Sequence, residues 1–283
     1  MPELPEVQTV VDDLRSAGVE GDTIHSVAIN WENTVSPLSA AQFVSEVGGR
    51  RIELIRRRGK YIVFSLDRGA YLLTHLRMTG QYELCTPKQE TDPHVRVEFK
   101  LDGDRRLRFH DTRKFGRIIF TRRPREVLDK LGPDPFDPNL TPDKFASALH
   151  KYTRQIKALL LDQSFLAGLG NIYCDEALFA AGVHPMENSC LIEPYKAKEL
   201  LLQIRTVLRK GISNRGTSLG EGETNYISGG KRGENREALR VYGLKGQPCP
   251  RCGTPLEKIY VAQRASYFCP CCQTRSHQES SSK

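Results

Sequence analysis

Residues 249–272 read CPRCGTPLEKIYVAQRASYFCPCC and hold five of the eight cysteines of the chain. Two C-x2-C pairs, Cys249/Cys252 and Cys269/Cys272, are separated by the 16 residues 253–268. This spacing is typical of a four-cysteine zinc site, in which each pair lies on a tight turn with both thiolates facing one ion. The segments LEKIYVA and ASYFC predict a β-hairpin between the pairs. Because four thiolates close the coordination shell, we expect one structural Zn²⁺ that holds the fold and does not activate water.

Two features near these pairs leave alternatives. Cys271 offers another thiol that could replace Cys272, although the symmetry of the spacing favours Cys272. Pro248 and the first C-x2-C pair also fit half of the nucleobase deaminase signature, which needs an upstream H-x-E. The H-x-E of this chain, His277-Gln-Glu279, lies downstream in a polar tail, so the sequence argues against a deaminase.

The charge of the chain points to a polyanionic partner. The 283 residues carry a formal net charge of +8. The basic residues cluster in two stretches: Arg50, Arg51, Arg56, Arg57, Arg58 and Lys60; then Arg105, Arg106, Arg108, Arg113, Lys114, Arg117, Arg122, Arg123 and Arg125. Nucleic-acid phosphates are bound by Lys and Arg, so this clustering favours nucleic acid, whereas a merely solvated basic surface is the alternative.

The hydrophobic pattern changes along the chain. Between residues 23 and 120 short β-branched or aromatic segments alternate with turn residues and predict an antiparallel sandwich or barrel. These segments are TIHSVAI, KYIVFSL, AYLLTHL, VRVEFKL, RLRFH and GRIIF. After the proline-rich stretch LGPDPFDPNLTPDKF the periodicity becomes helical, in PDKFASALH, RQIKALLLD, NIYCDEALFAAG and PYKAKELLLQIRTVLRKG. The fold class is therefore α+β and multidomain.

The amino terminus, MPELPEV, predicts a helix. Pro5 and Glu6 suit a first helical turn, apolar residues follow from Leu4 to Leu14 at helical spacing, and Gly18 marks the end. A helix start does not explain why the pattern already begins at Pro2.

These patterns predict five segments. They are an N-terminal β-sandwich domain (1–125), a linker (126–141), a helical DNA-binding domain (142–240) with a loop at 217–236, a zinc finger (241–274) and a disordered tail (275–283). No apolar run has the length of a membrane span, and no signal peptide is evident, so we expect a cytoplasmic protein without membrane contact.

Several motifs occur together: PELPEV, HLRMTG, DTRKFGR, AGLGNIYCDEALFAAGVHP and the hairpin with AQRASYFC. With these motifs, from residue 2 to about residue 273, the chain resembles the bacterial formamidopyrimidine-DNA glycosylases. The resemblance implies an N-terminal helix and β-sandwich, a helix–two-turn–helix domain and a zinc-finger hairpin. It also implies a monomer that acts on double-stranded DNA containing oxidised bases or abasic sites.

The resemblance gives the terminus a chemical role. In this family the initiator Met is removed, and the secondary amine of Pro2 attacks the anomeric carbon and forms a Schiff base, after which β,δ-elimination cleaves the strand. Glu3 would be the general acid–base group. Glu6 would either fix the amine or cap the helix. Lys60 matches the second amine, which contacts phosphate and assists elimination.

The resemblance also assigns residues that contact DNA. Met78, Arg113 and Phe115 would fill the space left by a flipped base, with Arg113 bonding the orphaned partner base. His94 matches a DNA-contacting position. A further group of phosphate-binding positions comprises Lys157, Gly170 with Gly168, Asn171 and Arg264. The loop at 217–236 matches the segment that closes over the flipped base.

Three other functions compete with an oxidised-purine glycosylase. An endonuclease VIII-like enzyme for oxidised pyrimidines usually begins PEGPE, so Leu4 argues against it. A zinc-ribbon DNA-binding protein without catalysis would not need Pro2, Glu3 and Lys60. A metal-dependent nuclease needs a carboxylate cluster suited to Mg²⁺, which the sequence does not suggest.

Overall fold

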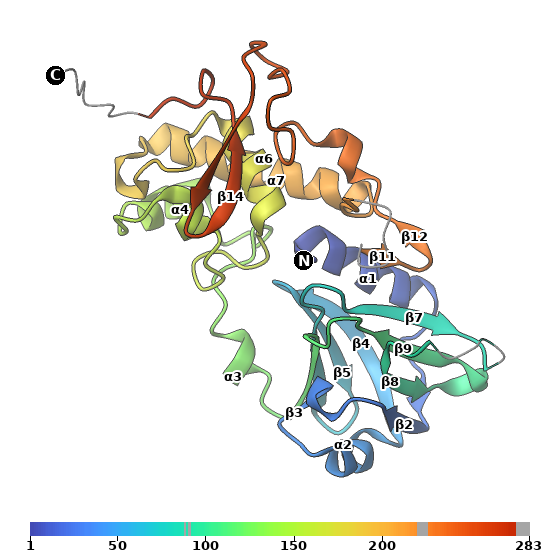
Figure 1. The fold of residues 1–283 in the computed structure, drawn as a ribbon. Coiled ribbons are helices and arrows are strands. Elements are labelled where there is room, and N and C mark those ends of the chain that lie inside the picture. Colours follow the sequence, from blue (N-terminus) through green and yellow to red (C-terminus); the bar gives the residue numbers. More distant parts are fainter. Residues whose placement is uncertain (88, 90–91, 220–225, 276–283) are drawn as a thin grey trace. The chain divides into compact units, whose positions relative to one another are not determined.

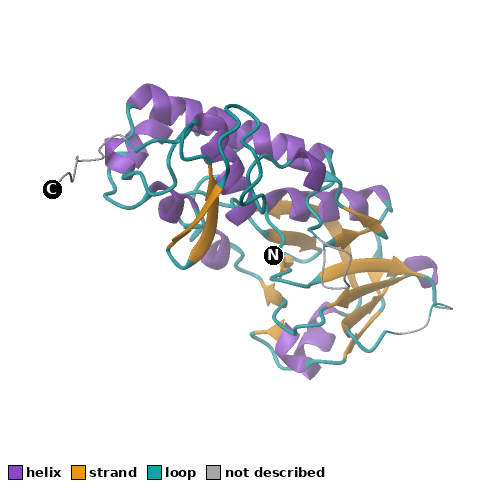
Figure 2. Ribbon diagram, turned by 45° about the horizontal axis from the view of Figure 1, so that its top comes forward, coloured by secondary structure: helices purple, strands orange, loops and turns teal. Residues whose placement is uncertain are grey.

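The computed structural model describes residues 1–87, 89, 92–219 and 226–275. The chain forms two compact units (Figure 1). The first unit comprises residues 1–130 and 211–236, and the second comprises residues 131–210 and 237–283. Strands dominate the first unit and helices the second (Figure 2), which confirms the predicted α+β class. In the part of the chain described, no helix is both long and apolar enough to cross a membrane.

Two sheets form the body of the first unit. One sheet has the order β1 (Thr23–Ile24), β4 (Arg50–Arg58), β5 (Tyr61–Leu66), β6 (Ala70–His75), β10 (Arg117–Thr121) and β3 (Val35–Ser36). The other has the order β2 (Ser26–Ile29), β8 (Val95–Lys100), β9 (Arg106–His110) and β7 (Gln81–Cys85). The pairs are antiparallel except β10 with β3, which is parallel.

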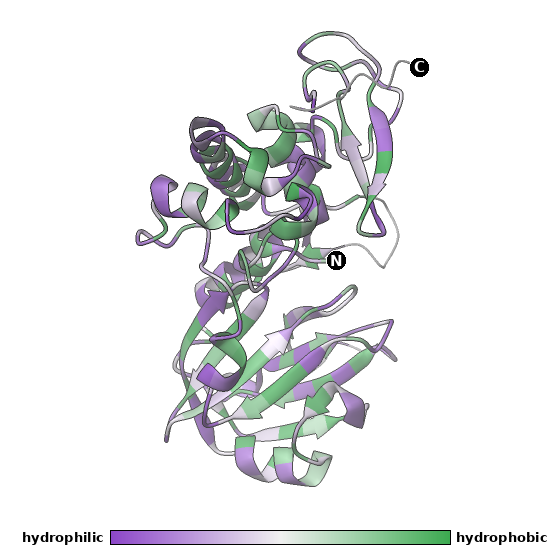
Figure 3. Ribbon diagram, turned by 90° about the vertical axis from the view of Figure 1, so that its left-hand side faces the viewer, coloured by the Kyte–Doolittle hydropathy of each residue, from purple (hydrophilic) through white to green (hydrophobic). Residues whose placement is uncertain are grey.

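Alternating side chains build the core between these sheets. On β5, Ile62 and Phe64 are buried in the core, whereas Tyr61 and Ser65 are half-exposed on the other face. Phe99 of the second sheet belongs to the same core. The alternation of apolar and polar residues along the strands is visible in Figure 3. The period of two therefore places one face of each sheet inside, and the predicted β-sandwich is confirmed.

Helix α1 (Leu4–Ser16) contributes to the same core through Val7, Val10 and Val11. It begins and ends close to where the sequence predicts. Two short helices, α2 (Ala40–Val47) and α3 (Arg125–Leu128), were not predicted. Short 3₁₀ turns lie at Glu32–Thr34, Asp102–Asp104, Ser189–Leu191 and Asn235–Ala238.

The segment 211–236 corrects the predicted domain boundaries. We expected residues 142–240 to form one helical domain, but 211–236 belongs to the first unit. Its strand β11 (Ile227–Ser228) pairs with β12 (Lys231–Arg232), and β11 contacts α1. The boundary was missed because the segment returns to a helix that is distant in the sequence.

The second unit contains α4 (Pro142–Leu149), α5 (Ile156–Leu160), α6 (Asn171–Ala181), most of α7 (Pro194–Ser213) and the hairpin β13 (Glu257–Val261) with β14 (Arg264–Phe268). The predicted linker is partly fixed here. Arg205 of α7 donates to the carbonyl oxygens of Pro135 and Leu140, each at 2.7 Å. The predicted tail lies outside the described residues except Arg275.

A buried ion pair attaches the hairpin to α6. The Lys157 ammonium lies 2.7 Å from the Asp175 carboxylate, and both side chains are 0% exposed. Asp175 also accepts hydrogen bonds from the Ser266 hydroxyl and the Tyr267 backbone N–H. Burial raises the pKa of Asp175 to about 6, and the Lys157 charge opposes this rise.

Lys157, which the resemblance assigns to phosphate binding, is thus directed into the protein in this structure. Its ammonium is fully buried and donates to Asp175 and, at 2.7 Å, to the Ala265 carbonyl. Asn171 donates to the same carbonyl at 3.0 Å. Both side chains therefore fix the strand that begins at Arg264.

We expect Lys157→Met to lower the free energy of unfolding by about 3 kcal/mol at pH 7, because it leaves a buried carboxylate without its cation. Urea denaturation measures this change. Lys151→Met, at an exposed position of the same unit, is the matched control and should change stability by less than about 0.5 kcal/mol. Equal stability of the two variants would contradict the role of the ion pair.

Candidate active site and nucleic-acid interface

The amino-terminal residues are buried. Pro2 is buried, and Glu3 and Glu6 are only 3% and 2% exposed. The backbone N–H of Glu3 donates to the Glu6 carboxylate at 2.7 Å, and the Glu3 side chain accepts from the backbone N–H of Glu6. This reciprocal capping box confirms the helix-capping role expected for Glu6. It also fixes the backbone directly after Pro2.

The other oxygen of Glu6 meets the returning segment 211–236. The backbone N–H of Thr217 donates to Glu6 Oε1 at 2.7 Å. Gly216 has a φ of +83°, and a Cβ there would lie 2.8 Å from Glu6 Cγ and 2.9 Å from Glu6 Oε1. Only glycine suits both this left-handed backbone and this close approach. The carboxylate is thus held by two backbone donors from distant parts of the sequence.

Three side chains fix the returning segment to α1. The Tyr226 hydroxyl donates to the Glu6 carbonyl oxygen at 3.1 Å. Arg215 donates to Asp13 at 2.7 Å, and the Ser228 hydroxyl donates to the same carboxylate. Burial raises the pKa of Tyr226, so its phenol stays neutral and remains a donor. These contacts flank residues 220–225, so the predicted loop 217–236 is described only at its two ends.

Lys60 lies next to a histidine that the sequence analysis did not single out. Residues 59 and 60 form a two-residue turn between β4 and β5, and Lys60 is only 5% exposed. His75 packs edge-on against Tyr61, and its Nδ1 accepts the Arg77 N–H at 3.0 Å. Burial, with the charges of Arg77 and Lys60, lowers the pKa of His75 to about 3. The imidazole is therefore neutral, with Nε2–H as a donor.

Met78, Arg113 and Phe115 lie on two loops and are exposed. Met78 is 42% and Phe115 47% exposed, unusual values for large apolar side chains. The Arg113 guanidinium lies 4.9 Å from the centre of the Phe115 ring. Each loop also contains a non-glycine residue in the left-handed region, Arg77 at φ 54° and Lys114 at φ 60°. Such backbone strain occurs often at functional sites.

His94 is half-exposed at the start of β8. Its Nδ1 lies 3.2 Å from Arg96 Nη2, and its carbonyl oxygen accepts from Asp111 N at 3.0 Å. The structure thus places a fixed histidine next to the segment that carries Arg113.

Arg264 begins β14 directly after a tight turn and is exposed. The turn residues Ala262 and Gln263 have φ of 46° and 61°, which is typical of a two-residue type I′ hairpin turn. Gly168 has a φ of +96°, and Gly170 is the N-cap of α6. Both glycines are buried, and the Asn171 amide donates to the hairpin instead of pointing freely outward.

Cys249, Cys252, Cys269 and Cys272 form one cluster in which all sulfur atoms lie within 4.8 Å of one another. The Cys249–Cys272 and Cys252–Cys269 distances are 3.9 and 3.5 Å. Four sulfurs at a Zn–S distance of about 2.3 Å would be about 3.8 Å apart, so the cluster fits one tetrahedral Zn²⁺. Cys271 is exposed and outside the cluster, which settles the fourth ligand as Cys272.

Family comparisons agree with this geometry. Residues 1–118 match the formamidopyrimidine-DNA glycosylase N-terminal domain, and residues 131–221 match the helix–two-turn–helix (H2TH) domain of the same enzymes. Residues 246–275 match the zinc finger found in FPG and IleRS. The chain belongs to the formamidopyrimidine-DNA glycosylase family.

Relatives match along nearly their whole length. The formamidopyrimidine-DNA glycosylase of Protochlamydia amoebophila is 43% identical over 97% of this chain and 100% of its own. That of Chloroflexus aurantiacus is 43% identical over 98% and 99%. Among solved structures, a variant of the Lactococcus lactis enzyme in complex with DNA containing Fapy-dG has a TM-score of 0.89 and 35% identity, over 97% of this chain and 100% of that one. The same enzyme with abasic-site DNA has a TM-score of 0.88.

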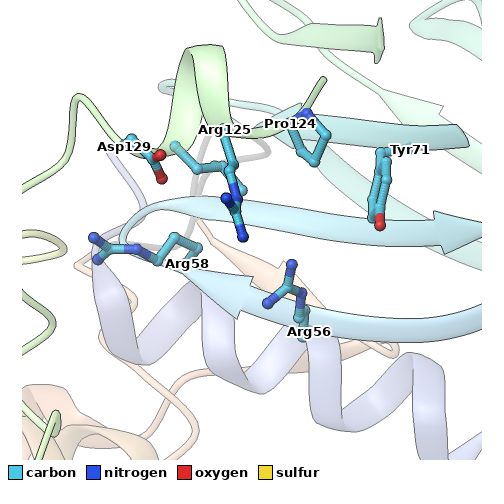
Figure 4. Close-up of a pocket in the computed structure, with 7 residues that line it drawn as sticks. Arg56, Arg58, Tyr71, Pro124, Arg125 and Asp129 are labelled. Atoms are coloured by element: carbon cyan, nitrogen blue, oxygen red, sulfur yellow. The ribbon is translucent and has the colours of Figure 1, made fainter. Parts of the chain in front are cut away.

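In this glycosylase-family chain, residues of both basic clusters meet at one hollow, although not every basic residue is exposed. Arg50 is buried and paired with Glu46. Arg56 and Arg58 line a hollow of about 360 Å³ together with Tyr71 and Arg125. Arg125 reaches from α3 toward the strand that carries the other two arginines (Figure 4).

We expect the His75 imidazole to make stability depend on pH. Its pKa is about 3 in the folded protein and about 6.5 in the unfolded chain, so its contribution is complete above pH 6.5 and is lost as the pH falls toward 3. The stability advantage of the wild type over His75→Gln should therefore shrink by on the order of 1 kcal/mol from pH 7 to pH 5. Urea denaturation at both pH values measures this, and an unchanged advantage would contradict the neutral, half-buried imidazole.

Replacing one cysteine ligand should release the metal. We expect Cys252→Ser to lose zinc and DNA affinity together, because the zinc holds the hairpin that presents Arg264. Mass spectrometry of metals and a DNA-binding titration measure the two properties. Cys271→Ser is the matched control and should keep both. Full zinc content and normal affinity in Cys252→Ser would contradict the structural role.

Proposed function

We propose that this protein is a bifunctional base-excision repair enzyme. In this proposal it removes oxidised purines, such as 8-oxoguanine and formamidopyrimidines, from double-stranded DNA and then cleaves the strand at the abasic site. The supporting observation is the buried Pro2–Glu3–Glu6 cluster at the start of α1 in a chain of the formamidopyrimidine-DNA glycosylase family. The Lactococcus lactis complexes with Fapy-dG and abasic-site DNA support the same substrates.

Pro2 is the proposed nucleophile once Met1 has been removed. Its secondary amine would have a pKa near 8 in water, so a useful fraction is neutral at pH 7. The nitrogen lone pair attacks C1′, and the bond between C1′ and the base breaks with its electrons going to the departing base. The nitrogen loses its proton, which balances the negative charge of the departing base, and so regains a lone pair. The sugar ring then opens as the C1′–O4′ bond breaks, which leaves a cationic Schiff base between Pro2 and C1′.

Glu3 is the proposed proton donor to O4′ as the ring opens, since it lies next to the amine in the chain. The iminium ion acidifies the C2′ proton. Loss of that proton expels the 3′ phosphate by β-elimination, and δ-elimination then expels the 5′ phosphate. Lys60 is proposed to bind the phosphate and assist elimination. Glu6 is proposed to hold the backbone of Glu3 and, through it, Pro2.

The exposed loop residues are proposed to stabilise the flipped state. Unstacking a base costs a few kcal/mol unless other groups fill the space. Met78 and Phe115 offer exposed apolar surface, and Arg113 offers donors to the orphaned base. His94 and Arg264, with the backbone around Gly170 and Asn171, are proposed to bind phosphates on either side. Lys157 supports Arg264 through the Ala265 carbonyl.

The zinc ion stabilises the hairpin and takes no part in the reaction in this proposal, because its four cysteines complete the shell. We propose that the enzyme acts as a monomer on chromosomal DNA in the bacterial cytoplasm. The endonuclease VIII-like alternative differs in substrate, so a panel of oxidised purines and pyrimidines separates the two.

The deciding experiment traps the Schiff base. The protein is mixed with duplex DNA that carries 8-oxoguanine opposite cytosine, sodium borohydride is added, and the adduct is mapped by peptide mass spectrometry. We expect a covalent link at an N-terminal Pro2. Protein that retains Met1 is the matched control and should give no adduct, because its proline nitrogen is an amide.

Each outcome has a distinct meaning. An adduct at Lys60 would keep the lyase activity but overturn Pro2 as the nucleophile. The absence of an adduct on both this duplex and an abasic duplex, from zinc-loaded protein with free Pro2, would favour a DNA-binding protein without catalysis.

A further inference from the structure

One buried carboxylate connects the two exposed loops. Asp111 is 0% exposed, and its side chain accepts hydrogen bonds from both loops. From the first loop, the Thr79 hydroxyl donates to Asp111 Oδ1. From the second, Arg113 N donates to Oδ1 at 3.2 Å and Gly116 N donates to Oδ2 at 2.6 Å. Arg113 N also lies 3.2 Å from the Thr79 hydroxyl oxygen, so the three residues form one closed network.

Packing below the network leaves little freedom. The buried ring of Phe109 lies directly under both loops. A Cβ on Gly80 would lie 2.8 Å from this ring, and a Cβ on Gly116 would lie 2.5 Å from it. Both loops therefore pack closely against the same ring.

The backbone of Asp111 holds a third segment. Its N–H donates to the His94 carbonyl at 3.0 Å, and its carbonyl accepts from Arg96 Nε at 2.8 Å. Arg96 is itself 7% exposed and contacts the His94 ring. One residue thus connects the segments of Met78, His94 and Arg113.

We propose that Thr79 and Asp111 are positioning residues that lock the two loops into a single rigid wedge. Met78 directly precedes Thr79, and Arg113 and Phe115 lie between Asp111 and Gly116. The lock would deliver all three side chains to a duplex in one fixed arrangement. Because the loops are already ordered, base flipping does not require a further loss of loop conformational entropy. This inference rests on the proposed base-flipping function.

Thr79 is the better residue to test, because removing the fully buried Asp111 carboxylate endangers the fold. Thr79→Val replaces the hydroxyl with a methyl group of similar size, and Thr79→Ser keeps the hydroxyl. Single-turnover rates are measured on 8-oxoguanine duplex and on abasic duplex, which lacks the base that must be flipped. A 2-aminopurine next to the lesion reports unstacking by its fluorescence.

We expect Thr79→Val to lower both the excision rate and the rate of the 2-aminopurine fluorescence change by about tenfold. The reason is that a small misplacement of a positioning group lowers the reaction rate strongly. Schiff-base formation on abasic DNA should stay within about twofold of the wild type. Thr79→Ser should restore excision. Equal losses of rate on both substrates would indicate a general structural role for Thr79. Unchanged rates on both substrates would show that Thr79 does not position the loops. Either result would overturn the proposal.

A double-variant comparison adds a second test. If Thr79 acts through the wedge, Thr79→Val should slow excision by less than about twofold when added to Arg113→Ala, because coupled residues are not additive. A full additional tenfold loss would contradict the lock. Failure of the proposed function is recognised separately, because the wild type itself would then neither excise the base nor form a Schiff base.

Discussion

The Glu6 carboxylate is the interaction on which the arrangement of the first unit depends. It is almost fully buried, and a buried charge is stable only with donors around it. Those donors are the backbone N–H groups of Glu3 and Thr217, which are more than 200 residues apart in the chain. The helix dipole of α1 favours negative charge at the same place. The need to satisfy one carboxylate therefore brings the amino terminus and the segment 211–236 together.

The same carboxylate restricts which residues can lie around it. The Glu6 side chain needs Gly216, because any Cβ there would collide with it. Glu3 needs Glu6 to fix its backbone, and Pro2 precedes Glu3 directly. A reactive amine at a chain end would normally be mobile. Here the neighbouring capping box fixes the backbone directly after Pro2, so that the nitrogen proposed as the nucleophile is oriented before DNA binds.

Local patterns in the sequence predicted much of the fold. Neighbouring residues and short spacings determine several of its parts, and these could be predicted. They are the strands with a period of two, the helices α1 and α4 to α7, and the four zinc ligands. Strand β4 was not recognised as a strand because RRIELIRRR is rich in arginine and contains a bulge between Ile52 and Leu54. The candidate site residues could be predicted from motifs. The burial of Lys157 could not be predicted, because its partners are distant in the sequence: Asp175 is 18 residues away, and Ala265 of the hairpin is more than 100 residues away.

The long-range contacts separate buried charged residues that support the fold from exposed residues that could contact DNA, and composition alone does not show this difference. Two charged residues that the sequence suggested for DNA are buried inside the protein, Lys157 with Asp175 and Arg50 with Glu46. Lys157 fixes the hairpin that presents Arg264, because it donates to the Ala265 carbonyl. Met78, Arg113 and Phe115 remain exposed, and the loops that carry them hydrogen-bond to another buried charged group, the Asp111 carboxylate. Precise recognition of a deformed duplex requires that arrangement, because an exposed side chain on an unsupported loop would lose in ordering entropy what its contact provides.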